Sequence, residues 1–234
     1  MQQINLLNSI NNGFNANFSM RRWCLDFIEK KNCRLTYIEM KNLDFVIEAE
    51  NCCEKEIELN QMEIDLLIKK YYQNNVIGGS KERIAEIVLG LPCSGKSTYL
   101  KNKNCVICDS DLIKELIPEY DGGRGNEICH KVSKKIFKEL LQNLAKDGYS
   151  LGVPIIGKSI KSFNEIYNVL ADNGYKIVVK YLKISKIEAL NRALIRFIKS
   201  GRYVSLDYIN QINEYEIDYV YNETANYSEV IYCS

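Results

Sequence analysis

Apolar residues alternate between strand-like runs and helix-like stripes in the part of the chain that follows about residue 80. Continuous apolar runs, which are typical of strands buried in a parallel sheet, cover residues 84–89, 105–108, 151–156 and 175–184. Helical spacing is found at residues 126–146, 163–171 and 187–198. Shorter helices are expected from residue 96 and at 111–116, with a last helix and a strand at 230–232 closing the chain. This alternation predicts an α/β fold with a mainly parallel sheet flanked by helices.

The first 80 residues show a weaker pattern and no catalytic motif. Residues 59–72 have the spacing of an amphipathic helix. The Gly78-Gly79-Ser80 segment after this helix is typical of a break between units. We therefore predict a small N-terminal accessory segment over residues 1–80 and a separate α/β domain over residues 81–234.

Charge and hydropathy narrow the class of protein. The formal net charge is +1, so no strong electrostatic field favours binding to nucleic acid or to an anionic membrane. No apolar run approaches the roughly 20 residues of a membrane-spanning helix. The N-terminus lacks the basic and apolar regions of a signal peptide. These features predict a cytoplasmic protein without a membrane partner.

The nine cysteines are irregularly spaced and odd in number. Cys105 and Cys108 form a CxxC pattern, which is compatible with a redox pair or a zinc site. Both lie in a predicted buried strand, where a thiol behaves as a small hydrophobic group, and we favour that interpretation. A reducing compartment without structural disulfides is expected.

A phosphate-binding motif of the form GxxxxGK[ST] follows the first predicted strand and precedes a predicted helix. Glycines in this motif let backbone N–H groups turn towards phosphate oxygens, and the helix start adds a positive dipole end. We expect Lys96 to reach the β- and γ-phosphates of ATP and the Ser97 hydroxyl to bind Mg²⁺. The expected nucleotide-binding residues are Gly90, Leu91, Pro92, Cys93, Ser94, Gly95, Lys96, Ser97 and Thr98.

Two carboxylates, Asp109 and Asp111, follow the second predicted strand. Ligands of open α/β sheets bind beyond the carboxyl ends of strands, so these groups are placed to serve Mg²⁺ or to abstract a proton from an acceptor hydroxyl. In the alternative interpretation, Asp109 caps the next helix and Asp111 only occupies its first turn. Lys114 either holds a charged substrate or lies on a solvated helix face.

Three arginines near the end of the predicted domain are candidates for contact with the transferred phosphoryl group. Arg192 and Arg196 are four residues apart and share a helix face, and Arg202 follows the break at Gly201. Cations that meet the charge on the γ-phosphoryl oxygens are a main source of catalysis in phosphoryl transfer. In the alternative interpretation, these arginines form a basic face without a binding partner. This alternative applies most strongly to Arg192.

Over residues 81–205 the chain resembles the zeta toxin family of P-loop kinases. The matching segments are Gly90 to Ser97, Asp109-Ser110-Asp111-Leu112-Ile113-Lys114, Pro118, Tyr120, Gly148-Tyr149, Gly174-Tyr175, Arg196 and Gly201-Arg202-Tyr203-Val204. The resemblance implies a cytoplasmic kinase that uses ATP and Mg²⁺ and phosphorylates the 3′-hydroxyl of the amino sugar in UDP-N-acetylglucosamine. It also implies that Asp111 is the general base, that Lys96 is the lysine of the P-loop, and that Arg196 and Arg202 face the phosphates.

One segment departs from the family pattern. Where the family commonly places Glu-Gly-Thr or Asp-Gly-Thr to hold the acceptor, this chain reads Val153-Pro154-Ile155-Ile156-Gly157-Lys158-Ser159. Ile156 has no polar side chain for a sugar, and Lys158 and Ser159 are the candidate substitutes. The identity of the acceptor therefore stays open. It could be another small molecule, such as an antibiotic or a dinucleotide, or a nucleic acid end, although the near-neutral charge disfavours a nucleic acid end.

The resemblance also implies a partner, because the family is often inhibited by a small helical antitoxin that obstructs the nucleotide site. Residues 1–80 precede the kinase domain directly, so we also consider that this segment inhibits in cis. An accessory domain packed on the sheet is the alternative. A different class of protein, a nucleotide-binding regulatory module with little turnover, is disfavoured because Asp111 and the arginines are present.

Overall fold

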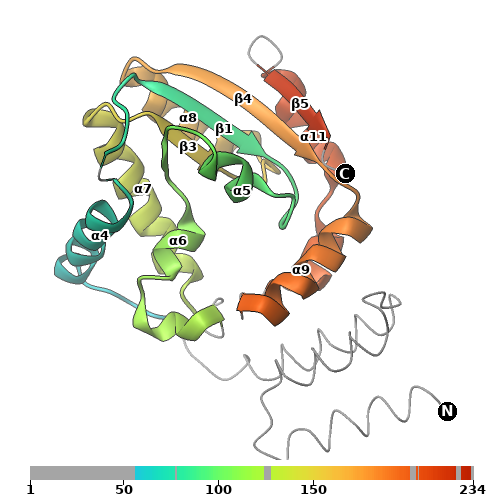
Figure 1. The fold of residues 1–234 in the computed structure, drawn as a ribbon, viewed down its shortest axis with the longest axis horizontal. Coiled ribbons are helices and arrows are strands. Elements are labelled where there is room, and N and C mark those ends of the chain that lie inside the picture. Colours follow the sequence, from blue (N-terminus) through green and yellow to red (C-terminus); the bar gives the residue numbers. More distant parts are fainter. Residues whose placement is uncertain are drawn as a thin grey trace, which may run out of the picture.

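The computed structural model describes residues 56–76, 78–123, 128–200, 204, 206–224 and 228–232. Five parallel strands form one sheet in the order β2-β3-β1-β4-β5. The strands are β1 (Ile84–Leu89), β2 (Val106–Ile107), β3 (Leu151–Pro154), β4 (Lys176–Lys183) and β5 (Ser228–Tyr232). The prediction of a parallel α/β sheet flanked by helices is therefore confirmed (Figure 1).

The helices alternate with the strands along the chain. They are α4 (Gln61–Asn75), α5 (Lys96–Lys101), α6 (Ser110–Lys114), the 3-10 helix η1 (Pro118–Gly123), α7 (His130–Lys146), α8 (Ile160–Asp172), α9 (Lys186–Ser200), α10 (Leu206–Gln211) and α11 (Glu214–Glu223). The single last helix of the sequence prediction is wrong, because two helices precede β5. Asn213 begins the second of them by accepting a hydrogen bond from the Tyr215 N–H.

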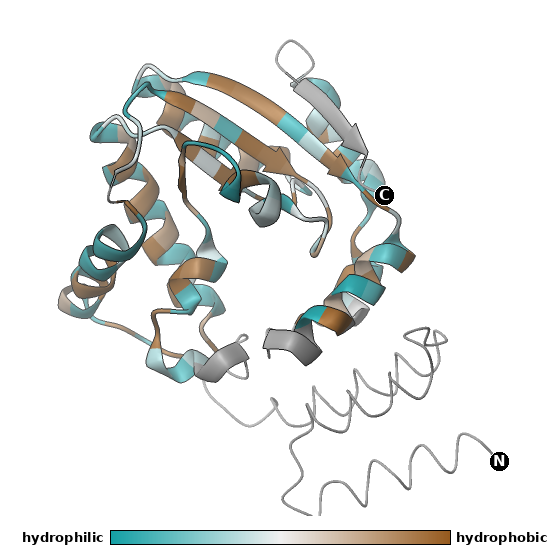
Figure 2. Cartoon of the chain, in the orientation of Figure 1, coloured by the Kyte–Doolittle hydropathy of each residue, from teal (hydrophilic) through white to brown (hydrophobic). Residues whose placement is uncertain are grey.

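The largest hydrophobic cluster lies on one face of the sheet. Ala85, Ile87 and Leu89 of β1 pack there with residues of α7 and α8, and the opposite face carries a smaller cluster with Leu100 of α5. Figure 1 shows α8 behind the sheet and α5 in front of it. Figure 2 shows apolar residues concentrated on the strands and mixed with polar ones along the helices. Successive side chains of a strand point to opposite faces, so the sheet packs against helices on both faces.

Strand geometry also explains the two cysteines of the CxxC pattern. Cys108 belongs to the larger cluster, whereas Cys105 packs against the smaller cluster on the other side of the sheet. Burial raises the pKa of the Cys105 thiol to about 11 and raises that of Cys108 further. The two side chains therefore act as protonated apolar groups, as the favoured interpretation held, and not as a redox pair.

Helix α4 is the described part of the front segment. It begins at a capping box in which Asn60 and Glu63 each accept a backbone N–H of the other. Ile64 and Tyr71 are fully buried in the same core cluster as the sheet, and α4 contacts α7. Residues 1–55 lie outside the described residues, so the boundary at residue 80 and the role of the segment stay predictions.

Within the described part of the chain, no helix combines the length and the apolar character that a membrane crossing requires.

Candidate active site

The GxxxxGK[ST] segment forms a loop between the end of β1 and the start of α5. Gly90 has φ +146°, and a Cβ there would lie 2.6 Å from the carbonyl oxygen of Leu182 and 2.7 Å from Ser94 Oγ, so no larger residue fits. Gly95, with φ +96°, precedes α5 as its N-cap residue. The first turn of α5 therefore opens directly onto the loop, and its N–H groups lie at the positive end of the helix dipole.

The side chain of Lys96 is held inside this loop. Its Nζ donates hydrogen bonds to the carbonyl oxygens of Gly90 at 2.8 Å and Leu91 at 2.7 Å. The pKa of Lys96 is lowered to about 8, mainly by burial; the nearby Asp109 opposes this shift, and the charge of Arg196 contributes to it. The ammonium is thus a desolvated cation, and an anion entering the loop would stabilise its charge.

The two carboxylates after β2 have different environments. Asp109 is buried and caps α6, because its Oδ1 accepts the Asp111 N–H at 2.9 Å. Its other oxygen, Oδ2, accepts a hydrogen bond from Ser97 Oγ at 3.3 Å. Asp111 lies in the first turn of α6, and its side chain is 38% exposed. The capping role expected in the alternative interpretation is therefore present, and it brings Asp109 to the P-loop serine.

Lys114 is not on a solvated helix face. Its side chain is 5% exposed, and its Nζ lies 3.7 Å from Asp111 Oδ1. Both residues line a cleft of about 1290 Å³ that also contains the P-loop. A buried ammonium in this position fixes the direction of the Asp111 carboxylate at the cleft.

The arginines of α9 differ from each other. Arg192 Nε donates a hydrogen bond to Glu188 Oε1 at 2.6 Å, one helical turn away. Arg196 lies close enough to Lys96 for its charge to lower the lysine pKa. Both arginines line the cleft, as the shared helix face predicts, and Arg192 forms an ion pair with Glu188. Arg202 lies outside the described residues.

A family model described as zeta toxin matches residues 74–219. The chain belongs to the zeta toxin family. The resemblance seen in the sequence is therefore confirmed, and membership supports a P-loop kinase-type function.

Solved structures agree with the fold of a zeta toxin. A chain from the PezAT chromosomal toxin–antitoxin system of Streptococcus pneumoniae is 18% identical, with a TM-score of 0.62, over 75% of this chain and 79% of that one. A candidate kinase from Chloroflexus aurantiacus is 13% identical, with a TM-score of 0.46, over 64% of this chain and 87% of that one. No curated protein sequence matches.

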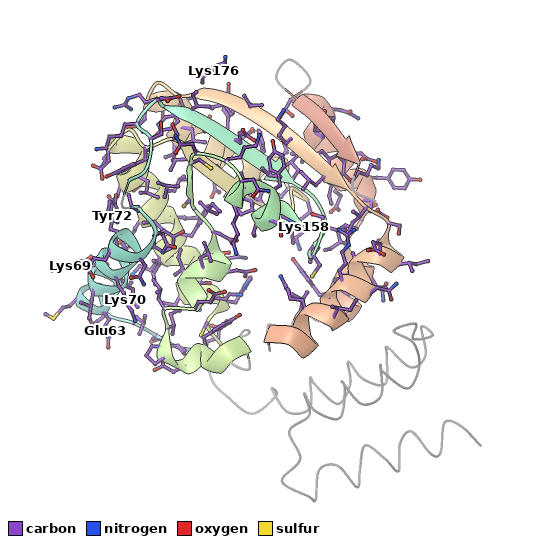
Figure 3. The ribbon with its side chains drawn as sticks, viewed as in Figure 1. Glu63, Lys69, Lys70, Tyr72, Lys158 and Lys176 are labelled. Carbon is purple, nitrogen blue, oxygen red and sulfur yellow. The ribbon has the colours of Figure 1, made fainter. Side chains whose placement is uncertain are left out.

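In this chain, the segment that departs from the family pattern lies on the cleft wall after β3. Its backbone supports the P-loop, because the carbonyl oxygen of Ile156 accepts the Gly90 N–H at 3.3 Å. Ser159 caps α8 by accepting the Ser162 N–H, at 3.4 Å. The Lys158 ammonium lies 5.0 Å from the centre of the Tyr208 ring, and Figure 3 shows Lys158 on the inner side of the molecule. Of the two candidate substitutes, Lys158 thus presents charge and Ser159 performs a helix-capping role.

The cleft has two parts. We call residues 90–98 with Asp109 the donor half, and the lining on α7, the loop after β3 and α10 the acceptor half; Asp111 and Lys114 of α6 lie where the two halves meet. The acceptor half includes His130 and Lys134, four residues apart on α7, which the sequence interpretation missed. Their spacing gives them one helix face, but only the packing of α7 brings that face to the cleft. Glu56 also lines the cleft, and its Oε2 lies 3.1 Å from Lys131 Nζ.

Proposed function

We propose that this member of the zeta toxin family is an ATP- and Mg²⁺-dependent kinase that phosphorylates a hydroxyl group of a nucleotide sugar, with UDP-N-acetylglucosamine as the first candidate. The observation that carries the proposal is the convergence of Lys96, Ser97, Asp109, Asp111 and Arg196 on one cleft. These groups lie in the loops and helices that follow β1, β2 and β4. Their charges suit a triphosphate, a divalent cation and an alcohol.

The donor half fits a magnesium nucleotide. Ser97 Oγ and Asp109 Oδ2 are hard oxygen donors 3.3 Å apart, which is the chemistry that Mg²⁺ prefers. We assign these two residues to the metal, which neutralises charge on the β- and γ-phosphates when bound. Lys96 leaves its two carbonyl partners and binds the phosphate oxygens.

Asp111 is the proposed general base. Its exposed carboxylate accepts the proton of the acceptor hydroxyl while that oxygen forms a bond to the γ-phosphorus and the bond to the bridging oxygen of ADP breaks. Lys114 orients the carboxylate, and Arg196 and Arg202 meet the charge of the transferred group. Lys158 and the capping residue Ser159 complete the proposed substrate contacts.

Mass spectrometry after incubation with ATP, Mg²⁺ and a panel of nucleotide sugars tests the proposal. We expect one added phosphate on UDP-N-acetylglucosamine, and no addition with the Asp111→Asn variant. That variant should still bind ATP, because Asp111 is not among the P-loop contacts. A folded wild-type protein that leaves every nucleotide sugar unmodified would contradict the proposed acceptor.

A different anionic acceptor is the second candidate, and one observation favours it. The wall after β3 carries Ile155 and Ile156 in the segment where the family pattern has Glu-Gly-Thr or Asp-Gly-Thr, while Lys134 and Lys158 add positive charge. The same assay extended to dinucleotides, phosphorylated antibiotics and nucleic acid ends distinguishes this candidate, because one of these would be phosphorylated in place of the sugar.

We also propose an inhibitory partner, supported by the origin of the PezAT relative in a toxin–antitoxin system. An antitoxin in trans and residues 1–55 in cis are the two sources. A variant without residues 1–55 retains α4 in the core and separates them: higher ATP turnover than the full chain indicates inhibition in cis. Unchanged turnover by a folded variant contradicts it.

A further inference from the structure

The aromatic residue Tyr71 connects α4, which precedes the nucleotide-binding motif in the sequence, to the loop that carries the two carboxylates. Tyr71 is completely buried, and its hydroxyl donates a hydrogen bond to the carbonyl oxygen of Ile107, the last residue of β2. The backbone of Asp109 is close enough to the same hydroxyl to influence its pKa. One side chain therefore contacts both ends of the turn by which the chain leaves β2.

Strand β2 needs such a contact because it is short and lies at the edge of the sheet. It comprises two residues and, among the described strands, pairs only with β3. The N–H groups of Val106 and Cys108 bond to Ser150 and Gly152 at 2.8 Å each. Backbone groups alternate along a strand, so the polar groups of Ile107 between them point away from β3. Tyr71 takes the place of a missing neighbour strand at Ile107.

The position of the Tyr71 hydroxyl is fixed from the side of α4. Ile64, two turns earlier, is buried in the same cluster, and Asn75 Nδ2 donates to the Tyr71 carbonyl oxygen at 3.2 Å. Burial first, and then the neighbouring Cys108 and Asp109, keep the pKa of the Tyr71 hydroxyl above its usual value. The hydroxyl consequently remains a donor across the pH range in which a kinase works.

We propose that Tyr71 is a positioning residue for phosphoryl transfer: by holding Ile107 and Asp109 it directs the carboxylates of Asp109 and Asp111 into the cleft. Asp109 contacts both this turn and Ser97, so a shift of the turn displaces the metal-binding oxygen. Asp111 follows on the helix that Asp109 caps and shifts with it. The catalytic meaning of this inference rests on the proposed function.

Tyr71→Phe in the full chain tests the inference, because it removes only the hydroxyl. Two matched variants provide controls. Tyr175→Phe removes another buried hydroxyl, which bonds to the Tyr149 carbonyl at 2.6 Å far from the carboxylates. Tyr72→Phe removes the hydroxyl of the next residue on α4, labelled in Figure 3, which bonds to Asp147 at 2.9 Å. Urea unfolding of all three measures the general loss of stability.

We expect Tyr71→Phe to lower kcat by about 10- to 100-fold with KM for ATP changed less than about twofold, because a misplaced group costs rate more than binding. Amide hydrogen exchange of residues 106–115 should accelerate by about tenfold or more in this variant alone. This second measurement needs no turnover. A wild-type protein without kinase activity therefore contradicts the proposed function, whereas unchanged exchange at 106–115 contradicts the role of Tyr71.

Equal effects on kcat in Tyr71→Phe and Tyr175→Phe would also overturn the inference, since the loss would then reflect stability only. If Tyr71→Phe does not fold, 3-fluorotyrosine at position 71 of the otherwise unchanged chain replaces it. Its ¹⁹F signal should shift when Mg²⁺ and a non-hydrolysable ATP analogue are added together. A signal that stays in place with saturating nucleotide contradicts the coupling between Tyr71 and the carboxylates.

Discussion

Residues 90–98 of the donor half form one contiguous segment that is held by backbone geometry, whereas the acceptor half is lined by side chains from separate elements. At the donor half, Gly90 admits no larger residue, and Lys96 bonds to the loop itself. At the acceptor half, Lys134 and Lys158 come from α7 and from the loop after β3. We therefore expect substitutions in the donor half to reduce phosphoryl transfer to every acceptor. Substitutions in the acceptor half should change which acceptor is phosphorylated.

The largest effect is expected at Asp111, where the two halves meet. Asp111→Asn removes the proposed base, and a general base contributes about 10²- to 10⁴-fold to rate. We expect kcat to fall by that range with ATP affinity unchanged, measured by steady-state kinetics and by titration with a fluorescent ATP analogue. Loss of ATP affinity equal to the loss of kcat would show that Asp111 binds ATP, which contradicts the proposed separation of the two halves.

Arg196→Ala is expected to lower kcat by about 10²- to 10³-fold, the effect of removing one group that meets charge in the transition state. Arg192→Ala on the same helix face is the matched control, because Arg192 is paired with Glu188. We expect it to change kcat by less than about threefold. Equal losses in the two variants, measured in the same kinetic assay, would show that the helix face acts as a whole.

Lys134→Ala is expected to raise KM for the acceptor by about tenfold, since a hydrogen bond to a charged group contributes about 1.5–3 kcal/mol before losses to solvent. KM for ATP should stay unchanged. Lys135→Ala, the next residue on α7 and exposed outside the cleft lining, is the control. A parallel rise of both KM values would contradict the separation of the two halves.

The smallest effect is a pH dependence of ATP affinity. Burial lowers the pKa of Lys96 to about 8, and bound phosphates raise it by stabilising the ammonium. Affinity should therefore be constant below about pH 8 and fall by up to tenfold per unit as the pH rises above this value. Calorimetric titration at several pH values measures this, with Lys96→Met as the control that cannot titrate. Constant wild-type affinity for ATP up to about pH 9.5 would contradict a lowered pKa of Lys96.

The fold and the donor half could be predicted because their signals are local in the sequence. The apolar runs indicated β1 and β4 directly, and the spacing from Gly90 to Ser97 specifies a backbone shape. Helix boundaries were less accurate: the pattern begins at residue 126, whereas α7 begins at His130. The division between α10 and α11 depends on a cap at Asn213 that the apolar pattern does not record.

The acceptor half and the role of α4 could not be predicted because they depend on contacts between distant segments. His130 and Lys134 reach the cleft only through the packing of α7, and Tyr71 reaches Ile107 across 36 residues. An amphipathic pattern assigns Tyr71 to a buried face without identifying the strand that the face covers. Lys114 shows the same limit, since its burial follows from the docking of α6 against α7.

The most direct measurement compares ADP release with phosphate incorporation into the acceptor in one reaction of the full chain with ATP, Mg²⁺ and UDP-N-acetylglucosamine. The account predicts equal amounts of ADP and of a sugar phosphate monoester, with both abolished in Asp111→Asn. Release of ADP without any phosphorylated acceptor, or equal turnover by the Asp111→Asn variant, would contradict it.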